Sequence, residues 1–122
     1  MGDLKHMKVL LVDDDESIRT SMEYFFRKKT AVFKAVESAE IGIETLRDGG
    51  PVDIFIVDYK LPGMNGLSLL KIIRKQWPDA LTVLVTAHGN PEIISKALRI
   101  GVDSFVQKPF TTRTIMDALK WA

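Results

Sequence analysis

The sequence has no cysteine among its 122 residues, which excludes disulfide cross-links, thiolate metal sites and cysteine nucleophiles and fits a reducing compartment. An excess of charge of one sign is also lacking. The chain has 17 lysines and arginines and 16 acidic residues. A net charge of +1 gives no indication of a broad basic surface that would bind nucleic acid or an anionic membrane. No apolar run is long enough to span a bilayer. Function must therefore come from a local site.

The length and composition predict a single domain, because 122 residues with 46% hydrophobic content suffice for one core. Residues 1–7 lack the apolar stretch of a signal peptide and include a second methionine, Met7. We therefore interpret residues 1–7 as an N-terminal extension and residues 8–122 as the domain. The last helical pattern stops at Ala122 without a cap, as it would in a domain excised from a longer protein, but the sequence leaves open whether the chain stands alone.

Short β-rich runs alternate with helical patterns along the chain, which is typical of βαβ units and a parallel sheet. Pro78 is expected to end the third helix and Gly101 the fourth. The weaker second strand is expected at an edge of the sheet. The predicted strands cover residues 9–12, 31–36, 52–58, 81–85 and 104–107, and the predicted helices follow Asp15, cover residues 39–46 and about 67–77, start near residue 91, and start near residue 111. The pattern predicts an α/β fold.

Polar residues come directly after four of these strands. Asp13 and Asp14 follow the first, Asp58 closes the third, Thr86 follows the fourth and Lys108 follows the fifth. In open parallel sheets, ligands bind at this edge. Converging carboxylates would repel one another and raise a pKa, and a divalent cation such as Mg²⁺, which prefers oxygen ligands, would relieve the repulsion. Asp15 precedes an amphipathic run instead and is expected to cap a helix.

The same positions carry a resemblance to a family. From about residue 8 to its end, the chain resembles the receiver domain of two-component response regulators. The resemblance implies a flavodoxin-like, doubly wound fold with a five-stranded parallel sheet of order 2-1-3-4-5 and helices on both faces. The elements that carry it, in this order, are Val12–Asp15, Val57–Gly66, Val85–Ala87, Phe105 and Lys108–Phe110.

The resemblance also implies the chemistry. Asp58 would be the phosphoacceptor for a phosphoryl group from the histidine of a sensor kinase or a phosphotransfer protein. Asp14, Asp58 and the backbone carbonyl of Lys60 would bind Mg²⁺, for which Mn²⁺ substitutes, and Asp13 would act through water. Lys108 would supply a second positive charge. Such a domain catalyses only its own phosphorylation and dephosphorylation and is otherwise a signalling module in the cytoplasm.

The output step implied by the resemblance is a switch. Thr86 would move toward the phosphate and Phe105 would turn inward, which reshapes the surface of the fourth helix, fifth strand and fifth helix for an output domain, a downstream protein or a homodimer. Pro109 is expected to fix the Lys108 loop, and we consider a cis bond there. The candidate contacts on the output surface are Ile94, Ala97, Leu98, Phe105 and Ile115.

Two positions flank the expected phosphoryl group. Lys60 and His88 lie two residues after Asp58 and Thr86, and we expect them to tune hydrolysis of the phosphate. Contact with the kinase is expected around the first helix, with Ile18, Arg19 and Met22 as candidates. We expect no direct binding of nucleic acid and no membrane contact.

Three alternatives remain. Asp13–Ser17 formally fits the Asp-x-Asp-x-Ser motif of haloacid-dehalogenase-type phosphatases, with Asp13 as nucleophile and Asp15 as acid. Those enzymes are generally longer, and Asp58 would have no role in one. A nucleotide-binding flavodoxin-like module would need a glycine-rich loop where this chain has acids that repel phosphate. A structural pseudo-receiver would not need the intact set of site residues.

Overall fold

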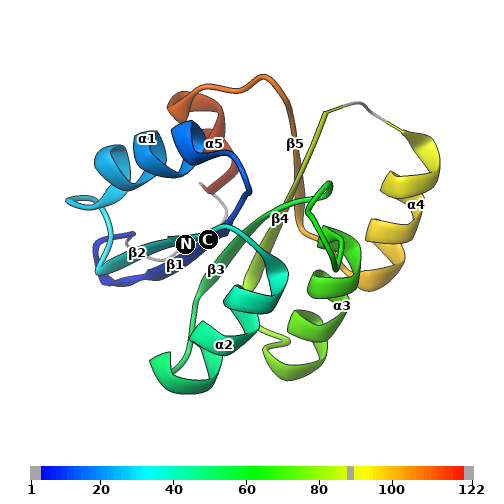
Figure 1. Ribbon diagram of the computed structural model, residues 1–122, viewed down its shortest axis with the longest axis horizontal. Coiled ribbons are helices and arrows are strands. Elements are labelled where there is room, and N and C mark those ends of the chain that lie inside the picture. The colour runs from blue at the N-terminus through cyan, green and yellow to red at the C-terminus, as the bar shows by residue number, and fades with distance from the viewer. Residues whose placement is uncertain (1–3, 88–89, 120–122) are drawn as a thin grey trace.

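The structure is a computed structural model that describes residues 4–87 and 90–119, and in it strands and helices alternate as predicted (Figure 1). A short 3₁₀ turn, η1 (Leu4–His6), precedes the first strand. The strands are β1 (Lys8–Val12), β2 (Val32–Val36), β3 (Ile54–Asp58), β4 (Leu81–Thr86) and β5 (Ser104–Gln107). The helices are α1 (Glu16–Phe26), α2 (Ala39–Gly49), α3 (Gly66–Gln76), α4 (Pro91–Ile100) and α5 (Thr112–Ala118).

The five strands form one parallel sheet in the order β2-β1-β3-β4-β5, which confirms the predicted topology and places β2 at an edge. Helices α1 and α5 cover one face of the sheet, while α2, α3 and α4 cover the other (Figure 1). The fold is therefore flavodoxin-like and doubly wound, with the carboxyl ends of all strands at one edge.

Two hydrophobic cores lie on the two faces, because side chains alternate along each strand. In β1, Leu10 and Val12 pack with α2, α3 and α4, whereas Val9 and Leu11 pack with α1 and α5. All five residues of the central strand β3 are buried. Burial on both faces explains why this strand has a nearly continuous apolar sequence before Asp58.

Helix ends follow local capping chemistry. The Asp15 side chain accepts a hydrogen bond from the Ile18 N–H at 3.2 Å and caps α1, as predicted. Gly101 ends α4 in the left-handed conformation with φ 97°, also as predicted. Helix α2 runs three residues beyond its predicted end at residue 46, because the chain leaves helical geometry only at Gly50, where φ is 76°.

The third strand begins at Ile54, two residues later than predicted. Just before it, the Asp53 N–H donates to the Lys8 carbonyl at 2.9 Å. The Asp53 carboxylate, however, accepts the hydrogen bond of the Lys8 N–H at 2.8 Å. A side chain therefore takes the place of a backbone acceptor there, and regular pairing starts only at Ile54.

The packed structure extends upstream of residue 8. Leu4 and Met7 are half-buried and pack against the core under α1 and α5. The Met7 carbonyl accepts a hydrogen bond from the Ala31 N–H at 2.9 Å. Within residues 4–87 and 90–119, every helix is too short or too polar to cross a membrane.

Candidate functional site

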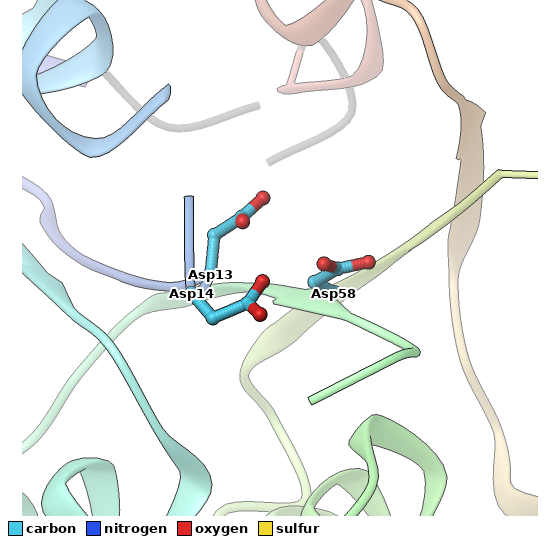
Figure 2. A group of neighbouring side chains, drawn as sticks. All are labelled: Asp13, Asp14 and Asp58. Atoms are coloured by element: carbon cyan, nitrogen blue, oxygen red, sulfur yellow. The ribbon is translucent and has the colours of Figure 1, made fainter. Parts of the chain in front are cut away.

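Three carboxylates meet where β1 and β3 end. Oxygens of Asp13, Asp14 and Asp58 all lie within 4.8 Å of one another, and Figure 2 shows the side chains turned toward a common space. Strands β1 and β3 are neighbours, with Val12 beside Val57, so the residues that follow them must be adjacent. Asp13 and Asp58 are 0% and 3% exposed, while Asp14 is open to solvent. The structure thus brings together the acids that the sequence placed at strand ends.

Lys108 bridges the two buried acids. Its Nζ lies 2.9 Å from Asp58 Oδ2 and 3.3 Å from Asp13 Oδ2. The Lys108 N–H donates to the Thr86 carbonyl at 2.8 Å, which ties the loop after β5 to the end of β4. The peptide bond between Lys108 and Pro109 is cis, in agreement with the sequence expectation.

One ammonium group, that of Lys108, pairs with two buried carboxylates, those of Asp13 and Asp58. The pKa values of all three groups are shifted as a result of burial and of this unequal number of charges. Burial raises the pKa of Asp58, and the charge of Asp13 adds to the rise although Lys108 opposes it. Burial likewise raises the pKa of Asp13, against the Asp15 N–H and Lys108. Burial alone would lower the pKa of Lys108, but its hydrogen bond to Asp58 and the two carboxylate charges outweigh burial and raise it.

The donor set fits a divalent cation. Carboxylate oxygens are the hard ligands that Mg²⁺ prefers, and the three acids lie close enough to share one ion. Among the described residues, Asp13 Oδ2 is the one fully buried side-chain nitrogen or oxygen without a hydrogen bond, although it is ion-paired with Lys108. A cation with its bound water would supply the missing interaction.

Most of the predicted site residues line one open cleft of about 680 Å³. Asp14, Asp58, Lys60, Thr86 and Lys108 all contribute to its lining. The other lining residues are Tyr59, Leu61, Pro62, Ala87, Asn90 and Ile93. Lys60 is exposed at the edge of this cleft. The predicted tuning residue His88 lies outside the described residues.

Thr86 and Phe105 lie on neighbouring strands and on the same face of the sheet. Phe105 pairs with Leu84, and Thr86 follows Leu84 by two residues, so its side chain points the same way. Thr86 is buried and Phe105 half-buried against the core under α2, α3 and α4. Their placement on one face of neighbouring strands is compatible with the expected coupling.

The expected output surface is smaller than predicted. Leu98 is 60% exposed, and Ile94 and Phe105 are half-buried. Ala97 and Ile115 are wrong as surface contacts, because they are 0% and 1% exposed in the two cores. Their helical spacing is equally compatible with an inward face, and the sequence alone could not orient the two helices.

One of the three residues of α1 that we expected to contact the kinase is buried. Ile18 and Arg19 are half-buried, but Met22 is 3% exposed and belongs to the core, so it is wrong as a contact. Arg19 has a role that sequence reasoning missed. Its Nη1 donates to the Asp13 carbonyl at 2.9 Å and so braces the loop that carries the acids. The only signal in the sequence was its position four residues after the cap Asp15.

The sheet order and the acidic cleft define the class of protein: a flavodoxin-like α/β domain with three clustered carboxylates that could hold a cation. The family model of the response regulator receiver domain matches residues 9–120. The chain belongs to the response regulator receiver family.

Three relatives illustrate the range of proteins with this domain. The chemotaxis protein CheY-3 of Vibrio cholerae is 32% identical over 119 residues, which cover 94% of this chain and 90% of that protein. The DNA-binding transcriptional regulator NtrC of Proteus hauseri is 35% identical over 102 residues, 84% of this chain but 21% of that protein. The structure of a CheY-like receiver domain protein from Methanospirillum hungatei has a TM-score of 0.87 at 25% identity, covering 95% of this chain and 92% of that one.

The chain spans about a quarter of the length of several of the curated relatives that it matches. The family assignment does not favour the phosphatase alternative. Neither does the geometry, because Asp15, the acid in that reading, caps α1.

Proposed function

We propose that Asp58 accepts a phosphoryl group from the phosphohistidine of a sensor kinase or phosphotransfer protein in a Mg²⁺-dependent reaction. The observation that carries this proposal is the environment of Asp58. Its carboxylate is buried beside Asp13 and Asp14, and it contacts the single ammonium of Lys108. Such a cluster concentrates negative charge, which a bound cation and a positively charged partner would offset.

The residues have distinct roles in the proposed reaction. Asp14, Asp58 and the Lys60 carbonyl would hold Mg²⁺ or Mn²⁺ directly, and Asp13 would do so through water. The ion, when bound, offsets charge on the transferring oxygens. An oxygen of the ionised Asp58 forms the new bond to phosphorus as the bond from phosphorus to the histidine nitrogen breaks, leaving the imidazole with the electron pair. Lys108 then pairs with the phosphoryl oxygens.

The output of the proposed reaction is a conformational switch. The phosphate offers new acceptor oxygens, and the Thr86 hydroxyl lining the same cleft is a donor for them. Movement of Thr86 would let Phe105 turn inward and change the α4–β5–α5 surface, where Leu98, Ile94 and Phe105 are accessible. That surface would control an output domain, a downstream protein or a homodimer.

The proposal extends to the organisation of the chain. Residues 8–122 would form the receiver domain of a longer cytoplasmic response regulator, with residues 1–7 preceding it. The domain would catalyse only its own phosphorylation and dephosphorylation. The transcriptional regulator NtrC, of which the matched segment is 21%, illustrates such an arrangement.

The test is the intact mass of the protein after incubation with Mg²⁺ and acetyl phosphate. We expect one added phosphoryl group in the parent and in Asp13→Asn at reduced yield, and none in Asp58→Asn or without the metal. A variant Asp58→Asn that still labels while Asp13→Asn does not would overturn the proposal in favour of the phosphatase-like alternative.

A further inference from the structure

The loop between β3 and α3, residues 59–65, carries the Lys60 carbonyl that the proposed function uses as a metal ligand. Whatever fixes this loop also fixes that oxygen. The loop is closed on itself where the Gly66 N–H donates to the Tyr59 carbonyl at 2.8 Å. Its far side is held by a side chain from a different helix. Oε2 of Glu40, in the first turn of α2, accepts a hydrogen bond from the Met64 N–H at 3.0 Å.

The approach of the Glu40 carboxylate depends on a glycine. Gly63 has φ 76°, and a Cβ built on it would lie 2.7 Å from Glu40 Oε2. A side chain at position 63 would therefore push the carboxylate away from the Met64 amide. Both the left-handed conformation and the close approach require glycine here.

The charge state of Glu40 strengthens the contact. The Met64 N–H is the main cause that lowers the pKa of Glu40 below its ordinary value of 4.5, and a carboxyl group in that range is ionised at neutral pH. A hydrogen bond to an ionised acceptor is stronger than one between neutral groups. Glu40 is exposed and, within the described part of the chain, lies outside the lining of the acidic cleft. Its contact with the loop is thus separate from the site chemistry.

Both ends of this contact are anchored in the core. Ser38 caps α2, and the next residue, Ala39, is fully buried, which fixes where the first turn of the helix begins. On the loop side, Leu61 is buried and Met64 packs against the same core under α2, α3 and α4. The Glu40–Met64 hydrogen bond therefore joins the anchored first turn of α2 to the anchored loop that carries the Lys60 carbonyl.

We propose that Glu40 is a positioning residue for the metal-binding loop, whose carboxylate holds the Met64 amide and so sets the Lys60 carbonyl where a divalent cation needs it. This inference rests on the proposed function. It predicts that changes at Glu40 alter the affinity for the metal more than the chemistry that follows once the metal is bound.

The test compares the whole chain with Glu40→Ala, Glu40→Gln and the matched control Glu44→Ala, which removes the same charge from the same exposed face of α2. Calorimetric titration with Mg²⁺ and Mn²⁺ gives the affinity, and hydrogen exchange at the Met64 amide reports the contact without any metal. For Glu40→Ala we expect an affinity about tenfold weaker, the low end of effects seen when outer partners of metal ligands are removed. We also expect faster exchange at Met64 and a labelling rate by acetyl phosphate that returns to the parent value at saturating Mg²⁺.

Glu40→Gln retains an oxygen acceptor at the same length and should keep most of the affinity, and Glu44→Ala should match the parent. Gly63→Ala tests the contact with Glu40 present. It should weaken metal binding in the parent, and the further loss that it causes in Glu40→Ala should be smaller, because only the strain of alanine at φ 76° then remains.

Parent-like affinity in Glu40→Ala, or equal losses in Glu40→Ala and Glu44→Ala, would overturn the inference and leave the proposed function intact. A parent that neither binds Mg²⁺ nor labels would overturn both.

Discussion

At the residue scale, the cleft is governed by an imbalance of charge, since the buried Asp13 and Asp58 share the ammonium of Lys108. The pKa of Asp58 is raised above its ordinary value of 3.8. At pH values between the ordinary pKa of Asp58 in the unfolded chain and its raised pKa in the folded protein, the folded protein binds more protons than the unfolded chain. The stability therefore falls as pH rises through that window. Without metal, the ionised Asp58 is therefore a destabilising group at neutral pH.

Replacing this carboxylate should stabilise the metal-free protein. We predict that Asp58→Asn raises the free energy of unfolding at pH 7 by roughly 1 kcal/mol and flattens its decrease between acid and neutral pH. Urea denaturation of parent and variant at several pH values, in the presence of a chelator, measures the difference. The exposed Asp79→Asn serves as the control and should match the parent. A destabilised Asp58→Asn would contradict the electrostatic account.

A second prediction at this scale concerns the lifetime of the phosphate. The exposed Lys60 lines the cleft, and we expect its long cationic side chain to shield the phosphorus from water. Lys60→Ala should lose phosphate faster by roughly twofold or more, equivalent to about 0.4 kcal/mol in the barrier. The decay of the phosphorylated mass after removal of the donor measures it, with the exposed Lys71→Ala on α3 as control. Slower loss of phosphate in Lys60→Ala than in the parent would contradict the shielding role.

At the scale of elements, the junction of β3 and α3 is the most constrained part of the site. Gly66, the first residue of α3, lies so close to the backbone of Asp58 that a Cβ would collide with the Asp58 carbonyl. The absence of a side chain lets the helix start directly beside the end of β3. The collision is with backbone, which cannot rotate out of the way as a flexible side chain would.

Alanine substitutions separate this packing effect from helix propensity. Gly66→Ala should lower the free energy of unfolding by about 1–3 kcal/mol, because overpacking outweighs the gain of roughly 1 kcal/mol that alanine brings to a helix. Gly49→Ala in the last turn of α2 meets nothing within 4 Å and should be neutral or stabilising. Chemical denaturation of both variants measures the difference. Equal changes in the free energy of unfolding would show that the close approach of Gly66 to the Asp58 backbone does not affect stability.

The helices and strands themselves were largely predictable from the spacing of hydrophobic residues. The helix ends were marked by Asp15, Pro78 and Gly101, since local chemistry decides where such helices begin and end. Long-range contacts were not. Arg74 donates to the Thr82 hydroxyl at 2.7 Å and to Asp103 at 3.0 Å, joining α3, β4 and the turn before β5. Nothing in the sequence around Arg74 specifies acceptors that come from other elements, and the same holds for Glu40.

At the scale of the whole molecule, parallel strand order explains why the site residues were easier to predict than the surfaces. Every strand of a parallel sheet ends at the same edge, so Asp13, Asp58, Thr86 and Lys108 had to converge once the strands were assigned. Which side of α4 or α5 faces outward depends on packing against the sheet. For that reason the output surface predicted from the sequence included the buried Ala97.

Metal binding should stabilise the entire fold by mass action. A ligand that binds only the folded state at one hundred times its dissociation constant contributes about 2.7 kcal/mol. We predict that Mg²⁺ raises the thermal midpoint of the parent, and much less that of Asp58→Asn or Asp14→Asn, because each lacks one of the clustered carboxylates. Differential scanning calorimetry over a Mg²⁺ series measures the shifts. An equal shift in all three proteins would place the metal elsewhere.

The most direct test of the central claim is to locate the phosphoryl group chemically. After incubation with Mg²⁺ and acetyl phosphate, borohydride reduces an aspartyl phosphate to homoserine, which tandem mass spectrometry can assign to one position. The account predicts homoserine at position 58 and unmodified aspartate at positions 13 and 14. Homoserine at position 13 in a protein whose Asp58 stays unmodified would contradict it.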